Sequence, residues 1–439
     1  MFSRRNRRPK SPELLEAWES LDSGDVPGAL RQLRVAGEEQ PLAEVALVVG
    51  RAAREAGFDD LAQAATALAA DSEQPRALFE FGYACIERRV SYLAIPALRE
   101  TLRHSPGARV VLRELVSAYE DEGRHRDAVA VLSGFGGGLE EWPDRYLLVF
   151  NAIMAGDLAV ARREHALLSD PEDAKWQPAR DRQSRMLARA ADAERAGALD
   201  LTDLRGWQYA IGGTVLGTLS PFGFTAGMTG RYAWLQDSPE LCLRGLLRLR
   251  ALPAAAGVRP RSVSLLPDRD SRILGLAAAK VLDLPAEPFA PGREDTVVVA
   301  YDLNRVAAHE DGPDIIGQLY ERVPGQVLHE HASCWTDAPA VTPDSAGVLH
   351  QSVSAPWDGH LRQGAEGGIE QGAPDDRPEA EIAAGIAAAD PTPDDGDGEG
   401  PADPDEAFAA FATAVRSTWL TGERTRLGSA GPVPSSRFA

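Results

Sequence analysis

Polar residues follow two apolar segments that have the composition of buried strands, residues 263–267 and 296–301. Ligands of parallel α/β sheets bind at the carboxyl ends of the strands, so these two loops are the first candidates for a binding site. Free amides at the start of a helix can hold an anion, and a carboxylate in the second loop can accept from a ribose hydroxyl or hold hydrated Mg²⁺. The candidate ligand-binding residues are Asp268, Arg269, Asp270, Ser271 (the expected N-cap), Arg272 and Asp302.

A second group of potentially reactive side chains consists of His329, His331 and Cys334. Two histidines separated by one residue share a face of a strand, and imidazole and thiolate are zinc ligands. No fourth ligand has a matching spacing, so histidines on a strand beside an unrelated cysteine are the preferred interpretation. The sequence also has no Walker loop, dinucleotide fingerprint or nucleophile elbow, and we expect no catalytic residue, metal or cofactor.

The elements that must position these residues alternate between strand and helix. Apolar runs predict strands at 263–267, 296–301 and 325–329, and the amphipathic segments 271–282 and 314–322 predict helices between them. This alternation is typical of right-handed crossovers in a parallel sheet, and therefore of an α/β domain.

The chain just before these strands is rich in glycine and aromatic residues. Tyr209–Leu219 is interpreted as a short buried strand or loop, because glycines interrupt any helical period. Ser238, followed by a proline, opens a predicted helix that runs towards Gly257.

Residues 260–330 resemble the core of the type I phosphoribosyltransferase fold, with a strand, polar loop, alanine-rich helix and a second strand that ends in an acid. In that family the second strand ends in paired acids, and a Thr/Gly-rich loop then wraps the 5-phosphate of the ribose donor. Here Tyr301 replaces one acid, Asp302 matches the other, and residues 303–309 offer no such loop. The resemblance implies a nucleotide- or phosphoribosyl-handling enzyme, whereas the missing loop favours a binding or structural descendant.

A glycine followed five residues later by alanine recurs through the first 170 residues, and the alanines are 33, 32, 34 and 33 residues apart. This regular period is typical of stacked helical hairpins, with small side chains where two helices approach closely and a glycine at the turn. The pairs are Gly24 and Ala29, Gly57 and Ala62, Arg89 (in the glycine position) and Ala94, Gly123 and Ala128, and Gly156 and Ala161.

Gly82, Ala94 and Pro106 in the third copy resemble the tetratricopeptide pattern, and the resemblance covers about residues 11–170. The tryptophan expected early in each repeat is absent. The resemblance implies a concave surface that holds a peptide, a partner helix or a neighbouring domain. A polar helix at 181–197 is predicted to cap the stack.

The net charge of −20 is concentrated near the C-terminus, where residues 365–406 include fourteen acidic residues and a single basic residue, Arg377. Residues 362–404 contain too few aliphatic side chains to offset chain entropy, which predicts disorder. Residues 405–421 regain an amphipathic stripe, which predicts a helix that lies in the repeat groove, awaits a partner or stays weakly ordered. The stripe consists of Phe408, Phe411, Val415 and Trp419.

The sequence therefore predicts a multidomain α plus α/β chain. Three widely spaced cysteines and the lack of an apolar run after the basic N-terminus favour a soluble cytoplasmic protein without membrane segments. The predicted parts are a disordered basic arm (1–10), tetratricopeptide-like repeats with a capping helix (11–200), an α/β domain (201–353), a disordered acidic linker (354–404), an amphipathic helix (405–421) and a disordered tail (422–439).

We expect this chain to act as a protein-interaction scaffold. Its repeats would bind a protein or peptide, its α/β domain would sense a small anionic ligand, and no nucleic acid would be bound. The alternative is the phosphoribosyltransferase-like or other nucleotide-handling enzyme, using the loops after 263–267 and 296–301.

Overall fold

The computed structural model describes residues 8–363 and 369–435, and the chain divides into two compact units, residues 1–177 and 178–439. Residues 1–7 of the expected basic arm and residues 436–439 of the expected tail lie outside the described residues. No helix in the described ranges combines the length and apolar character needed to cross a membrane.

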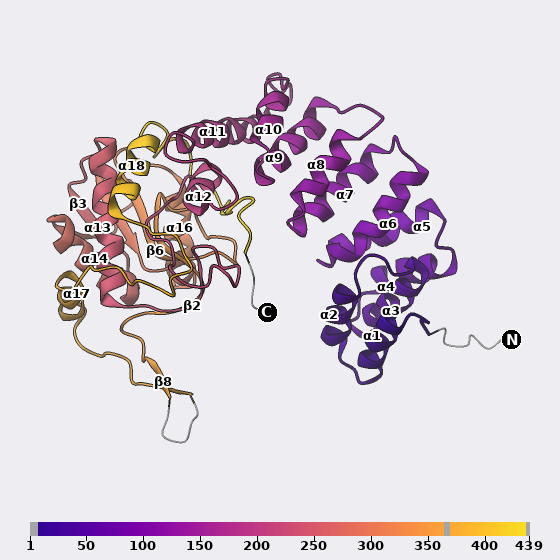
Figure 1. Ribbon diagram of the computed structural model, residues 1–439, viewed down its shortest axis with the longest axis horizontal. Helices are drawn as coiled ribbons and strands as arrows, with labels where there is room; N and C mark the ends of the chain where they lie inside the picture. The colour runs from indigo at the N-terminus through magenta and orange to yellow at the C-terminus, as the bar shows by residue number, and fades with distance from the viewer. Residues whose placement is uncertain (1–7, 364–368, 436–439) are drawn as a thin grey trace. The chain divides into compact units, whose positions relative to one another are not determined.

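The first unit is built from helices that pair with their neighbours in chain order (Figure 1). Two short helical turns, Glu141–Arg145 and Ala174–Trp176, lie among them. The helices are α1 (Pro12–Asp22), α2 (Val26–Ala36), α3 (Leu42–Glu55), α4 (Asp59–Ala70), α5 (Pro75–Glu87), α6 (Ser91–His104), α7 (Arg109–Asp121), α8 (His125–Ser133), α9 (Tyr146–Met154) and α10 (Leu158–His165).

The repeated small residues lie where the helices of this unit pack. Each of the five alanines is at most 6% exposed. The four turn glycines have φ between 66° and 80°, and Arg89 occupies the equivalent position with φ of 59°. Glycine adopts this left-handed conformation without the steric cost that a Cβ atom brings. The spacing of small residues in the sequence therefore corresponds to positions where helices pack in the structure.

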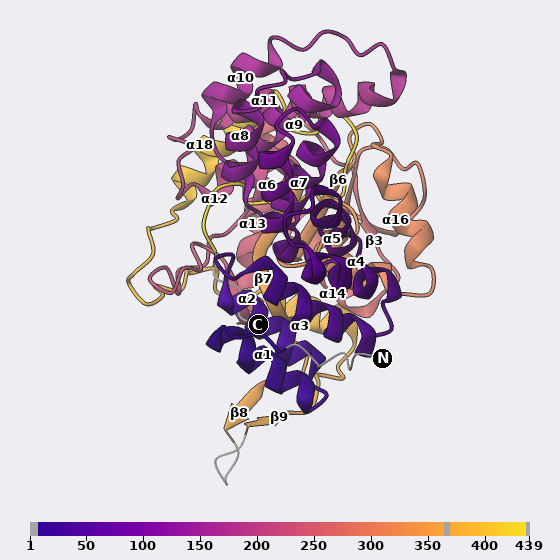
Figure 2. The ribbon, with the colours of Figure 1, turned by 90° about the vertical axis from the view of Figure 1, so that its right-hand side faces the viewer.

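The second unit contains a parallel sheet in the order β4-β3-β5-β6-β7, and β1 and β2 both pair with the far side of β7. Two further strands, β8 and β9, form an antiparallel hairpin that projects away from this sheet in both views (Figures 1 and 2). The strands are β1 (Val215–Leu216), β2 (Tyr232–Gln236), β3 (Ser262–Leu265), β4 (Ala286–Pro288), β5 (Thr296–Ala300), β6 (Val327–Cys334), β7 (Ser345–Ser354), β8 (Leu361–Gln363) and β9 (Ile369–Gln371).

Helices cover both faces of the parallel sheet. On one face, α13 (Pro239–Ala256) packs on β6 and β7, and α14 (Arg269–Leu282) packs on β3 and β5. On the other face, α15 (Leu303–Ala307) and α16 (Gly312–Tyr320) form a core cluster with Val298 and Leu328. The expected α/β architecture is present.

Two element assignments differ from the sequence interpretation. The strand or loop expected at 209–219 is confirmed for Val215–Leu216, which form β1, but residues 209–212 belong to helix α12 (Leu204–Gly212), because Gly212 and Gly213 fall at the helix end. The helix expected to cap the repeats, α11 (Gln177–Ala193), belongs to the second unit. Asp192 of α11 accepts hydrogen bonds from Ser417 and Thr418, which explains this placement.

The described residues of the acidic C-terminal region are structured. The prediction of disorder for 354–404 and 422–439 is therefore wrong for these residues. Helix α17 (Glu379–Ala387) packs on α13 and α14, and α18 (Asp405–Val415) packs on α13. The stripe from Phe408 to Trp419 is at most 5% exposed, and Phe411 contacts Tyr209 edge-on. The stripe is therefore buried within the second unit. It is not available for the contact with the repeats that the sequence suggested.

Arg424 anchors the end of the chain in the core of the second unit. Its Nη2 donates to Asp344 Oδ2 at 2.8 Å, and both side chains are at most 3% exposed. Arg322 also binds Asp344, at 2.7 Å. Burial alone would raise the pKa of Asp344, but the two guanidiniums lower it to about 2.

We predict that Gly82→Ala destabilises the first unit by about 1–3 kcal/mol, because overpacking forces neighbouring side chains to move. A Cβ atom on Gly82 would lie 2.6 Å from Leu98 Cγ. Urea unfolding of the full chain measures the effect. Gly107→Ala is the control, since nothing lies within 4 Å of its Cβ position. Equal losses in the two variants would contradict this packing.

We predict that the second unit loses stability as the pH falls from about 4 towards 2. The folded pKa of Asp344 lies below its usual value of 3.8, so its ion pairs stabilise the fold fully above that value and are lost on protonation. Urea unfolding across this range should give a flatter pH dependence for Asp344→Asn. An unchanged slope in that variant would contradict the assignment.

Candidate ligand-binding cavity

The two predicted loops lie side by side in the structure. They follow β3 and β5, which are neighbours, and β3 also pairs with β4 on its other side. The order of the strands along the chain reverses at this point, and α/β proteins bind ligands in the crevice at such a position. The two loops that the sequence singled out therefore follow neighbouring strands at the switch point of the sheet.

Side chains of these loops accept hydrogen bonds from backbone amides of the same unit. Asp268 is the N-cap of α14 and accepts from Ser271 N at 2.9 Å, so the cap is Asp268 rather than Ser271. Ser271 Oγ instead accepts from Tyr301 N at 3.0 Å. Asp302 caps α15 by accepting from Asn304 N at 2.8 Å. These side chains connect the loops and the helices that follow them.

Trp357 and Arg305 contact the other carboxylates of the crevice, whereas Asp268 Oδ2 is buried without a hydrogen-bond partner among the described residues. Trp357 is 1% exposed, and its Nε1 donates to Asp270 Oδ1 at 2.6 Å. Arg305 also binds Asp270, at 2.9 Å, and lies 3.7 Å from Asp302, which is 7% exposed. Both carboxylates are ion-paired, Asp302 is buried and Asp270 is partly exposed, so these residues do not form the open anion site expected there.

The two remaining candidate residues contact the C-terminal segment. Arg269 Nη2 donates to the carbonyl oxygen of Asp375 at 2.6 Å, and Arg272 lies 3.7 Å from Glu379. All six predicted residues thus lie at one edge of the sheet. Their contacts there are with other residues of the same unit.

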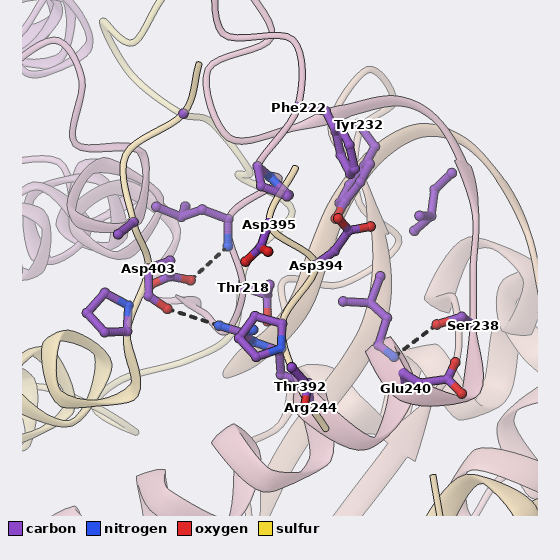
Figure 3. A pocket seen from close by; sticks show the side chains of 18 of the residues that line it. Thr218, Phe222, Tyr232, Ser238, Glu240, Arg244, Thr392, Asp394, Asp395 and Asp403 are labelled. Atoms are coloured by element: carbon purple, nitrogen blue, oxygen red, sulfur yellow. Dashed lines mark hydrogen bonds between the residues drawn. The ribbon is translucent and has the colours of Figure 1, made fainter. Parts of the chain in front are cut away.

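A cavity of about 770 Å³ lies elsewhere in the second unit, at the ends of β1 and β2 and the start of α13. Its size falls in the range of small-molecule sites. Phe222 and Tyr232 stand side by side on one wall, and residues 392–404 close another (Figure 3). We call residues 392–404 the acidic strap. Sequence reasoning missed this site, because its walls come from segments that are far apart in the chain.

Three lining residues carry buried polar atoms without a hydrogen-bond partner among the described residues. These atoms are Thr218 Oγ1, Arg244 Nε and both polar atoms of the Gln236 side chain. Buried polar groups in folded proteins are nearly always paired, so such atoms in a cavity indicate a missing partner. A bound molecule with both donor and acceptor groups would satisfy them.

The charges around the cavity do not favour an anion. Glu240, Asp394 and Asp395 line it, against the single guanidinium of Arg244. Burial lowers the pKa of Arg244, and the neighbouring Arg248 lowers it further. The Tyr232 hydroxyl points towards Asp394 (Figure 3), and burial raises the pKa of Tyr232 to about 12. A neutral or amine-bearing ligand fits this lining better than the anion expected from the sequence.

The acidic strap is held mainly through Asp403. Its carboxylate pairs with Arg205, at 2.9 Å, and with Arg248, and all three side chains are at most 9% exposed. Burial alone would raise the pKa of Asp403, but Arg205 and Arg248 lower it. Asp397 accepts from Gly223 N at 2.7 Å at the exposed surface. Asp403 is therefore the one deeply buried anchor of the strap among these acids.

Comparisons with known proteins gave no match to any family model, any curated protein or any solved structure. The site must therefore be interpreted from its own geometry.

We predict that Asp403→Asn destabilises the second unit by about 3–5 kcal/mol, because it leaves the buried Arg205 without its counter-charge and Arg248 with only the exposed Asp405. Urea unfolding measures the loss, and limited proteolysis should cut the strap faster. Asp397→Asn serves as the control and should change stability little, since its hydrogen bond is solvent-exposed. Similar effects in both variants would contradict the role of Asp403.

Proposed function

We propose that this protein is an interaction scaffold whose tetratricopeptide-like hairpins bind a segment of a partner protein. We further propose that the cavity of the α/β unit takes up a small polar ligand. Apolar and acidic side chains exposed together on two successive hairpins support the first part. The unpaired atoms of Thr218, Gln236 and Arg244 support the second part.

The proposed docking face lies on α5 and α7, the first helices of the third and fourth hairpins. Tyr83 and Val110 are 45% and 61% exposed, and Phe79 stacks on Tyr83 with ring centroids 6.3 Å apart. Exposed aromatic and aliphatic groups on one face favour a protein partner over solvent. We define the docking face by Phe79, Tyr83, Glu87, Val110 and Glu114.

The charge of the docking face indicates the chemistry of the partner. Glu87 and Glu114 form no ion pair within the described part of the chain. Burial raises the pKa of Glu114, and the nearby carboxylate of Glu87 raises it further. A lysine or arginine placed between them would relieve this repulsion. The favoured partner segment therefore combines basic side chains with apolar anchors.

The enzyme alternative depended on Asp302 and the loop from Asp268 to Arg272. Apart from Asp268 Oδ2, which is buried and unpaired among the described residues, the polar groups discussed above have partners in α14, α15, Trp357 and the C-terminal segment without a substrate. A binding role therefore explains more of the observed geometry than a phosphoribosyltransferase-like reaction.

We predict that reversing the charge of the docking face, with Glu87→Lys and Glu114→Lys together, weakens binding of basic apolar peptides at least about tenfold. The probes are peptides selected from a random display library against the full-length protein, and fluorescence anisotropy gives their Kd. The control reverses two exposed acids outside this face, Glu16 and Glu73. Selection of acidic peptides, or equal losses in both variants, would contradict the proposal.

A further inference from the structure

Four side chains with metal-binding atoms meet inside the second unit, away from the docking face. Asp237 follows β2, Cys242 lies in the second turn of α13, Tyr301 follows β5 and His331 belongs to β6. Asp237 is 1% exposed, and the other three are fully buried. Four separate elements therefore direct polar side chains to one point in the core.

The donor atoms of this cluster lie close to one another. Asp237 Oδ2 is 3.1 Å from His331 Nε2, 3.4 Å from Cys242 Sγ and 2.9 Å from the Tyr301 hydroxyl. Cys242 Sγ is 3.6 Å from His331 Nε2. Ligands about 2.0–2.3 Å from a tetrahedral zinc ion are separated by about 3.3–3.8 Å, so the observed distances are close to, and partly shorter than, those of a coordination shell.

The arrangement differs from a proton relay of the Cys–His–Asp kind. In a relay the carboxylate and the nucleophile contact different nitrogens of the imidazole. Here both contact Nε2, and His331 Nδ1 has no hydrogen-bond partner among the described residues. Gly245 and Gly347 leave room for the ring, since a Cβ atom on Gly347 would lie 2.7 Å from Nδ1. The ring is thus held with one nitrogen directed at the shared centre.

We propose that Asp237, Cys242 and His331 bind a zinc ion, and that the Tyr301 hydroxyl supplies the fourth donor. Thiolate, imidazole and carboxylate together match the ligand preference of zinc better than that of calcium or magnesium. Complete burial is typical of a structural site, in which the metal adds to the stability of the fold. The ion would join β2, β5, β6 and α13 at the edge of the sheet.

The histidine and cysteine motif noted in the sequence contributes only one ligand to this set. His329 and His331 share a face of β6, but His329 Nδ1 lies 3.1 Å from Ser345 Oγ. Cys334 is an odd number of residues from His331 and so points to the opposite face, where its Sγ lies 3.3 Å from Thr336 Oγ1. Asp237 and Cys242 are about ninety residues away in the chain.

The test uses the full-length protein purified without a histidine tag. Elemental analysis should find about one zinc per chain, and a strong chelator should lower the Tm of the second unit until Zn²⁺ is restored. Replacement by Co²⁺ should give a visible tetrahedral spectrum with a thiolate charge-transfer band. Cys242→Ser should lose that band, whereas the control Cys334→Ser should keep it.

Two results would overturn the proposal. In the first, the wild-type protein contains no stoichiometric zinc, binds no added Zn²⁺ or Co²⁺ and keeps its Tm in the presence of chelator. The four side chains would then form a hydrogen-bonded cluster without a metal. The second is a Co²⁺ spectrum that depends on Cys334 rather than Cys242. Because the wild-type measurements decide the first point, the test stands even where Cys242→Ser fails to fold.

Discussion

The second unit depends on buried charge pairs between its C-terminal segment and residues far back in the chain. Asp403 pairs with Arg205 and Arg248, and Arg424 pairs with Asp344, all almost fully shielded from water. Removing one partner of such a pair leaves an uncompensated charge in a low-dielectric environment, which is strongly unfavourable. The segment is therefore a structural part of the α/β unit, although its composition is that of a disordered tail.

This constraint shapes the functional interpretation. The pairs hold α18 on α13 and place the acidic strap over the cavity, so the apolar stripe of α18 is buried by its own unit. In the function we propose, the docking face on α5 and α7 binds a partner of different chemistry, basic and apolar. Asp403 also holds the acidic strap in place as one wall of the cavity.

Local patterns in the sequence predicted the hairpins, the three strands at 263–267, 296–301 and 325–329, and the edge of the sheet where polar loops meet. Those signals are either a regular repeat of about 33 residues, for the hairpins, or the composition of a few consecutive residues, for the strands. Strand β7 was missed because it carries polar residues such as His350. The order of the acidic strap was missed because the partners of Asp403 are about 155 to 198 residues away in the chain. The cavity and the Asp237 cluster also bring together distant segments.

Hydrogen exchange of the full-length protein tests the central claim most directly, namely that the C-terminal segment is integral to the second unit. The account predicts that amides of α18 and of residues around Arg424 are protected to nearly the same degree as those of α13, and that they open together with it. Exchange of these amides at the rate of an unstructured peptide, while α13 stays protected, would contradict the account.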